Sequence, residues 1–138
     1  MILLDTNVVS ETMKPGPDAR VMDWLNSQDI ESLWLSVTVV MELRFGAAIP
    51  SPGSRRRTLG NGIGEMVNEV FRGRKKQLDL PATRVFADRA ATAQRRSRRI
   101  GFADAAIAAV AIASGFSVAT RDTAPFLEMG ADVINPWN

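Results

Sequence analysis

Short apolar runs alternate along the chain with longer amphipathic stretches. The runs at residues 2–4, 33–35 and 117–119 have strand length, and each is followed by polar or helix-forming sequence. The stretches at residues 18–27, 37–49, 55–71, 81–99 and 103–114 space their apolar positions as amphipathic helices do. This alternation predicts an α/β fold, with a central parallel β-sheet flanked by α-helices.

Local signals place several helix ends. Ser36 is a suitable N-cap for the helix at residues 37–49, Pro81 fits a first helical turn, and Gly115 stands where a helix should end. Pro and Gly predict strong breaks at residues 50–53 and 60–64. Because the chain has 138 residues and neither a linker nor a repeat, we expect a single domain spanning residues 1–138.

Composition restricts the location and the partners of the protein. No apolar run approaches the roughly 20 residues that cross a bilayer, and an acid at position 5 comes too early for a signal peptide. We therefore expect a cytoplasmic protein without a membrane partner, which agrees with the absence of Cys. The net charge is only +2, but basic residues cluster at residues 55–57, 72–76 and 95–99. Such clusters suit a polyanion, and they suit solvated helix faces equally well.

The side chains that the sequence lacks restrict its chemistry. There is no His, Cys or Tyr, so the usual groups for acid–base or thiol chemistry near neutral pH are missing. A hydrolase of this composition would rely on a hard cation, held by oxygen ligands, that lowers the pKa of a bound water. Acidic residues are therefore the first candidates for a functional site.

Four acidic residues fall at the expected ends of strands and helices. Asp5 follows the first strand and Asp122 the last, at the edge where open parallel sheets bind ligands. Glu42 lies in the second turn of its helix, and Asp104 opens a helix that is otherwise almost entirely apolar. Each acid alone could serve a turn, a helix N-terminus or an ion pair with a nearby arginine. Together they would repel one another unless a metal neutralised them, so their combination favours a metal site.

Five segments carry a resemblance to a known family. Residues 3–11, Leu-Leu-Asp-Thr-Asn-Val-Val-Ser-Glu, resemble the opening motif of PIN-domain ribonucleases, specifically the VapC/FitB-like toxins. Residues 36–46 resemble the helix of the family's second acid, and residues 101–109 the helix of its third. Residues 119–122 and 133–137 resemble its closing segments. The motifs occur in the family's order and span the whole chain.

The resemblance implies a PIN-domain fold and an endoribonuclease, dependent on Mg2+ or Mn2+, that acts as the toxin of a type II toxin–antitoxin pair. It implies that Asp5, Glu42 and Asp104 are the core catalytic acids and metal ligands, and that Asp122 occupies a position where relatives carry Asp or Asn. It also implies polar neighbours that orient carboxylates, waters or substrate, although turn-forming and strand-capping roles suit some of them equally: Thr6, Asn7 and Thr120.

The expected mechanism uses water as the nucleophile. The three core acids would ligate one ion, directly or through water, and Asp122 would support that ion or a second one. Attack by water would leave 3'-hydroxyl and 5'-phosphate ends. Arg121 is a candidate phosphate contact, and an ion pair between Arg121 and Glu42 is its alternative role. The sequence does not indicate which RNA is cut.

Partners are also implied by the resemblance. Relatives pair with a small antitoxin whose tail covers the acidic groove, and they commonly dimerise. We therefore expect a cognate antitoxin, a homodimer and a toxin–antitoxin hetero-oligomer, with operator DNA reached only through the antitoxin. Four apolar side chains are candidates either for the antitoxin surface or for the core: Met13, Trp24, Leu25 and Phe45.

The chain departs from the family pattern in three places. Many relatives have an acid immediately before the residue that matches Phe126, where this chain has Pro125. Residues 97–100, Ser-Arg-Arg-Ile, replace a segment that breaks the helix in relatives, and could extend either the helix or the substrate-binding surface. Residues 50–64 match no family motif.

Two other functions are compatible with the sequence. The first is a catalytically weak module that binds an antitoxin and contributes to operator DNA binding and autoregulation, which the missing acid before Phe126 would explain. The second is a phosphatase or phosphotransferase with Asp5 as an aspartyl nucleophile. Such an enzyme would usually carry a second acid two residues later, where this chain has Asn7.

Overall fold

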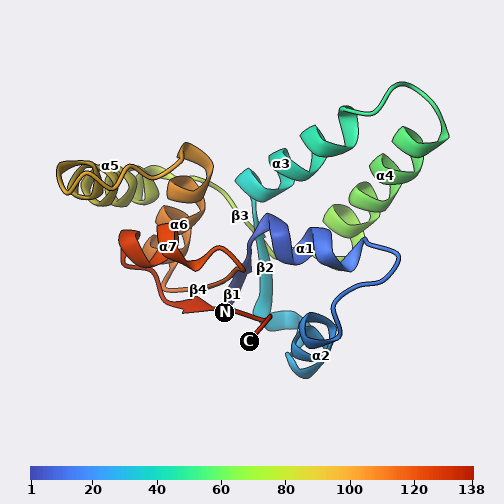
Figure 1. Ribbon diagram of the computed structural model, residues 1–138, viewed down its shortest axis with the longest axis horizontal. Helices are drawn as coiled ribbons and strands as arrows, with labels where there is room; N and C mark the ends of the chain where they lie inside the picture. Colours follow the sequence, from blue (N-terminus) through green and yellow to red (C-terminus); the bar gives the residue numbers. More distant parts are fainter.

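The computed structural model describes all residues, 1–138, and is built around a five-stranded parallel sheet in the order β3-β2-β1-β4-β5 (Figure 1). The predicted α/β fold with a central parallel sheet is therefore confirmed. The central strand β1 is paired on both sides, since Leu3 is the register partner of Trp34 on one side and of Val118 on the other. The strands are β1 (Ile2–Leu4), β2 (Leu33–Ser36), β3 (Lys75–Lys76), β4 (Ser117–Ala119) and β5 (Val133–Ile134).

Helices flank the sheet on both sides. In Figure 1, the first four helices lie to one side of the strands and the last three to the other, and α3 and α4 extend outward as an antiparallel pair. The helices are α1 (Thr6–Thr12), α2 (Ala19–Ser27), α3 (Val37–Ala48), α4 (Ser54–Glu65), α5 (Leu80–Arg95), α6 (Phe102–Ser114) and α7 (Thr123–Met129), with one turn of 3-10 helix, η1 (Ile30–Ser32), and a π-helical segment, η2 (Met66–Val70).

The core is centred on α6. Its residues 105–111 are all buried, and they pack with the fully buried strand residues Leu3, Leu35 and Val118. An all-round apolar helix must be covered on every side, which the sheet, α3, α5 and α7 do here. The consequence for function is that the start of α6, which carries Asp104, is fixed by the core.

The predicted helix ends are mostly confirmed. The Ser36 hydroxyl accepts a hydrogen bond from the Val39 N–H at the start of α3, and Gly115 ends α6 with a left-handed φ of 71°. Pro81 lies in the first turn of α5, behind an Asp79 cap. The predicted extension of this helix to residue 99 is wrong: α5 ends at Arg95, and the chain turns through Ser97, which has a φ of 59°.

The pattern of apolar residues did not predict four short elements: α1, α7, β3 and β5. Helices α1 and α7 have only two turns each, and such helices are held by tertiary packing more than by their own propensity. Strand β3 is a pair of lysines that pairs with β2 through the backbone, and the Lys75 ammonium donates hydrogen bonds to the carbonyls of Val67 and Phe71. Neither β3 nor β5 is long enough to show an alternating pattern.

The expected break at residues 60–64 is wrong, because α4 runs through it from Ser54 to Glu65. The predicted helix at residues 55–71 is close to what is observed, since α4 continues into η2. Glycine in a helix interior costs about 0.5–1 kcal/mol relative to alanine, which tertiary contacts can offset. Here Ile63 and Val67 anchor the segment in the core.

Gly60→Ala is expected to raise the free energy of unfolding by about 0.5–1 kcal/mol. A Cβ at this position meets nothing within 4 Å, so the substitution changes helix propensity without a steric clash. Urea unfolding followed by circular dichroism measures the change. Gly115→Ala is the matched control, and it should destabilise the protein because its φ of 71° is unfavourable for alanine. Equal effects of the two substitutions would contradict the prediction.

The side chains considered for an antitoxin surface separate into two groups. Met13, Trp24 and Leu25 pack against the core, whereas Phe45 on α3 is 68% exposed. In addition, no helix of the protein combines the length and the apolar character that a bilayer crossing requires.

Candidate functional site

Strand order creates a natural ligand-binding position beside β1. The chain moves from β1 to β2 and β3 on one side of the sheet, and later places β4 and β5 on the other side. In open parallel sheets, ligands bind outside the carboxyl ends of the strands at such a change of direction. Asp5 directly follows β1, and Asp122 lies three residues after the end of β4. Both acids therefore lie at this position.

The two remaining predicted acids reach the same region from helices. Glu42 is on α3, and Asp104 is in the first turn of α6. The negative charges of Asp5, Asp122 and Glu42 all raise the pKa of Asp104, so the four carboxylates lie close enough to repel one another. The structure thus brings together side chains from positions 5, 42, 104 and 122.

Asp5 is the most enclosed of the four acids, and both of its carboxylate oxygens accept hydrogen bonds. Oδ1 accepts from the backbone N–H of Thr6 at 2.7 Å, which caps α1, and Oδ2 accepts from the Thr120 hydroxyl at 2.7 Å. Asp5 is buried and Thr120 is completely buried. This arrangement fixes the orientation of the Asp5 carboxylate across 115 residues of sequence.

The predicted polar neighbours form a network around the acids. The Thr6 hydroxyl donates to Glu42 Oε1 at 2.7 Å. The Asn7 side chain donates to the Thr120 hydroxyl and accepts from the backbone N–H of Arg121, both at 3.3 Å. Thr6 and Asn7 therefore hold a helix acid and the end of β4 in place relative to Asp5.

Burial and mutual repulsion both make ionisation of the site costly. Burial raises the pKa of Asp5, the hydrogen bonds from Thr120 and Thr6 offset part of that effect, and the charges of Glu42 and Asp122 raise the pKa further. Burial is also the largest cause at Asp104, where it combines with the repulsion of the other three acids to raise the pKa to about 6. No salt bridge neutralises any of the four. The site therefore has excess negative charge near neutral pH.

The donor chemistry of the site fits a hard divalent cation. Four carboxylates offer only oxygen ligands, the type that Mg2+ and Mn2+ prefer, and a cation would relieve their repulsion. No three of the acids converge into a closed ligand cage. Hydrogen bonds from Thr6 and Thr120 hold the carboxylates of Glu42 and Asp5. Mg2+ commonly binds through one or two carboxylates and keeps several waters, so such a cage is not required.

Arg121 extends from the end of β4 beside Asp122, and it makes no ion pair with Glu42. Its guanidinium lies over the ring of Trp137, 5.3 Å from the ring centre. The side chain is exposed, whereas Trp137 is buried. A buried aromatic ring thus supports a cation at the rim of the acidic site.

Glu11, which lies in the opening motif, has a structural role that the sequence did not reveal. Its carboxylate accepts hydrogen bonds from Lys14 Nζ and from the backbone N–H of Asp18, both at 3.0 Å. The hydrogen bond from Lys14 is the main reason that the pKa of Glu11 is lowered. Glu11 therefore holds the α1–α2 connection and is not one of the clustered acids.

Thr120→Val is expected to lower the free energy of unfolding by about 1–3 kcal/mol, because it leaves buried polar partners unsatisfied. The Thr120 hydroxyl donates to Asp5 and accepts from both Asn7 and the Asp122 N–H. Urea unfolding is the measurement, with Thr58→Val on the exposed face of α4 as the matched control. Thr120→Ser keeps the hydroxyl and should recover most of the loss. A Thr120→Val protein as stable as the control would contradict the assigned network.

Comparisons with known proteins identify relatives of the whole chain. The PIN domain family model matches residues 2–131. "VapC ribonuclease Y4jK" from Sinorhizobium fredii is 49% identical over 137 residues, which cover 99% of this chain and 98% of the relative. "Toxin FitB" from Neisseria gonorrhoeae is 38% identical over 138 residues, which cover 100% and 99%.

Two solved structures have nearly the same fold. "FitAcB from Neisseria gonorrhoeae" superimposes with a TM-score of 0.94 at 38% identity, covering 100% of this chain and 99% of that one. "FitAB bound to IR36 DNA fragment" superimposes with a TM-score of 0.93 at 38% identity, covering 100% and 96%. Since the match includes every strand and helix, the acids at the edge of β1 and β4 stand on a shared scaffold.

Proposed function

The chain belongs to the PIN-domain family, and on that premise we propose that it is a metal-dependent endoribonuclease, the toxin of a toxin–antitoxin pair. The observation that carries the proposal is the group of four mutually repelling carboxylates at the carboxyl edge of β1 and β4. Its substrate would be RNA, as the name of the VapC ribonuclease relative suggests. The chain has no His or Tyr to perform the same reaction without a metal.

In this proposal, Asp5, Glu42 and Asp104 hold a Mg2+ or Mn2+ ion, directly or through water, and Asp122 contributes from the rim. When bound, such an ion lowers the pKa of water and offsets the charge that develops on the phosphate. Asp5 supplies the best-oriented carboxylate, since both of its oxygens are already fixed by hydrogen bonds.

The neighbouring side chains would position the reacting groups. Thr6 holds Glu42 toward the site, and Asn7 and Thr120 hold the end of β4 against Asp5. Arg121, whose guanidinium lies over the Trp137 ring, would contact a phosphate beside the acids. Because water attacks in this scheme, the products carry 3'-hydroxyl and 5'-phosphate ends.

The similar gonococcal protein was solved as the FitAB complex on a DNA fragment, which supports a partner for this chain as well. We propose a cognate antitoxin that covers the acidic groove, and operator DNA binding only through that antitoxin. We also propose that the chain forms a homodimer and assembles with the antitoxin into a hetero-oligomer. We propose Phe45, which is exposed on α3, as a contact for the antitoxin tail.

The test is cleavage of a labelled RNA panel by the purified chain in Mg2+, Mn2+ or EDTA, with mapping of the product ends. We expect cleavage with either metal, none in EDTA, and 5'-phosphate ends. Cleavage that persists in EDTA, or products with 2',3'-cyclic phosphates, would contradict the proposed chemistry. A folded protein that binds its antitoxin but cuts no RNA in either metal would favour a binding module that acts in autoregulation.

A further inference from the structure

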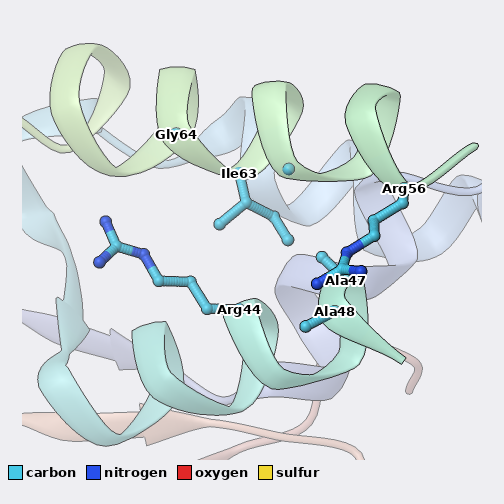
Figure 2. A pocket seen from close by; sticks show the side chains of 7 residues that line it. Arg44, Ala47, Ala48, Arg56, Ile63 and Gly64 are labelled. Atoms are coloured by element: carbon cyan, nitrogen blue, oxygen red, sulfur yellow. The ribbon is translucent and has the colours of Figure 1, made fainter. Parts of the chain in front are cut away.

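A cleft lies between α3 and α4, outside the group of acids. Its volume is about 270 Å3, and Arg44, Arg56 and Ile63 are among its lining residues. Figure 2 shows Arg44 on α3 and Arg56 on α4 at opposite ends of the cleft, with Ile63 between them. The cleft thus has a cation at each end and small or apolar side chains in the middle, and no acidic residue lines it.

Neither arginine has a structural partner of opposite charge. The four ion pairs of the protein involve other residues, namely Lys14, Arg20, Arg74 and Arg98 with their partners. Both Arg44 and Arg56 are exposed. Their charges are therefore available to an anion from solution.

Several residues of α4 disfavour the helix that they form. Three arginines, residues 55–57, occupy its first turn, where the helix dipole disfavours positive charge, and the turn contains no acid and no side-chain cap. Gly60 and Gly64 line the cleft, and a Cβ at either position would meet nothing within 4 Å, so close helix packing does not require glycine there. Residues whose local conformational preference disagrees with the element that contains them are typical of functional surfaces.

The cleft adjoins a second cavity that reaches the group of acids. This cavity of about 510 Å3 shares Ala47 and Ile63 with the cleft and is also lined by Thr6, Glu42 and Arg55. The basic start of α4 therefore lies between the cleft, which Arg56 lines, and a cavity that contains Glu42.

We infer that the α3–α4 cleft binds the phosphate backbone of the RNA substrate, with Arg44 and Arg56 contacting two different phosphates upstream or downstream of the cut. The inference rests on the proposed ribonuclease function. Two separated cations with small residues between them suit a repeating polyanion better than a single carboxylate, and open glycine backbone leaves room for a sugar–phosphate chain. The contacts would add affinity and register with little dependence on base sequence.

The test compares the double variant Arg44→Gln/Arg56→Gln with Arg72→Gln/Arg84→Gln. The control makes the same charge change at exposed arginines that line neither cavity and form no ion pair. Binding of a fluorescent single-stranded RNA is measured by anisotropy over a salt series, with Asp104→Asn in every protein so that binding does not depend on cleavage. Cleavage rates are measured separately with Asp104 intact.

We expect the cleft variant to bind RNA about tenfold more weakly than the control. For the cleft variant, the slope of log Kd against the logarithm of the salt concentration should be smaller by about 1.4, which is the value for two lost phosphate contacts on a single strand. In cleavage assays KM should rise while kcat stays close to that of the control. Its thermal midpoint should be unchanged or higher, since Arg56 opposes the helix dipole.

Three outcomes would overturn the inference: equal binding and equal salt slopes in the two double variants, no RNA binding by the parent protein, or a lower thermal midpoint that accounts for the loss. Competition by an acidic peptide at a lower concentration than RNA would assign the cleft to a protein partner instead. Failure of the proposed function looks different, because the parent would then bind RNA through the two arginines without cutting it in any metal.

Discussion

Asp104→Asn is expected to stabilise the protein at pH 7 to 8 while reducing RNA cleavage by about a hundredfold to a thousandfold. The stabilising effect follows from the raised pKa of Asp104, about 6 against an ordinary value of 3.8. Since the side chain is partly exposed, the shift corresponds, after allowance for solvent screening, to a gain on the order of 1–2 kcal/mol. The loss of cleavage follows from removing a preorganised charge at the reacting centre. Stability and activity thus change in opposite directions.

The pH dependence of this effect has a defined sign. Below about pH 3, Asp104 is protonated in both the folded and the unfolded protein, so its raised pKa places no penalty on the folded state. As pH rises from about 3 to 6, the unfolded state loses its proton first, and the contribution of Asp104 to stability is lost. The advantage of Asp104→Asn over the parent should therefore be about half of its full size at pH 5 and largest above pH 6.

Urea unfolding at pH 5 and pH 8, without divalent metal, measures the difference. Asp88→Asn on the exposed face of α5 is the matched control and should change stability little at either pH. Addition of Mg2+ should stabilise the parent more than Asp104→Asn, because the ion binds the folded state. An Asp104→Asn protein that is less stable than the parent at pH 8 would show that repulsion does not dominate at this position.

Asp5→Asn is expected to reduce cleavage at least as strongly, with little change in stability. The asparagine keeps one oxygen acceptor, so either the cap of α1 or the bond from Thr120 is lost, at a cost of about 1 kcal/mol. Removal of a buried charge offsets this cost, because burial is the main reason that the pKa of Asp5 is raised. Asp5 and Asp104 thus differ in what their removal does to folding.

Single-turnover cleavage in saturating Mg2+, together with urea unfolding of the same samples, tests this prediction. Asp88→Asn again supplies the control, with unchanged rates. A folded Asp5→Asn protein that retains more than about a tenth of the parent's activity would remove Asp5 from the catalytic group. A protein that fails to fold would instead assign Asp5 to the structure, and Thr120→Val should then fail in the same way.

The central strands and the main helices could be predicted because their patterns are long or strongly apolar. Residues 2–4 and 117–119 are strands as predicted, and α6 begins one residue before its predicted start. Strand β3 could not be predicted from Lys75 and Lys76, because two lysines carry no apolar pattern and the strand is defined by its pairing with Leu35 and Ser36 of β2. Residues 60–64 are helical because Ile63 and Val67 pack in the core, and the number of glycines in the segment does not indicate this packing.

The positions of the four acids could be predicted because each stands at the end of an element whose direction the fold class fixes. The hydrogen bonds of Thr120 with Asp5 and Asn7 could not, since they depend on how residues more than 100 positions apart are paired. The stacking of Arg121 on Trp137 is a similar case. The charge imbalance of the α3–α4 cleft became visible only once the two helices were placed side by side (Figure 2).

The hydrogen bond between Thr120 and Asp5 joins positions 115 residues apart, and this separation affects the time at which the site forms during synthesis. Strand β1 and the first two acids leave the ribosome early, but β4, which pairs with β1, is made only after α5 and α6. Contacts of such long sequence separation form late in folding. A nascent chain that has reached only α5 therefore holds Asp5 and Glu42 without Asp104, Thr120 or Asp122. On this basis, the growing chain would not cleave RNA near the ribosome that makes it. The proposed cleavage activity would begin only after β4 has joined the sheet.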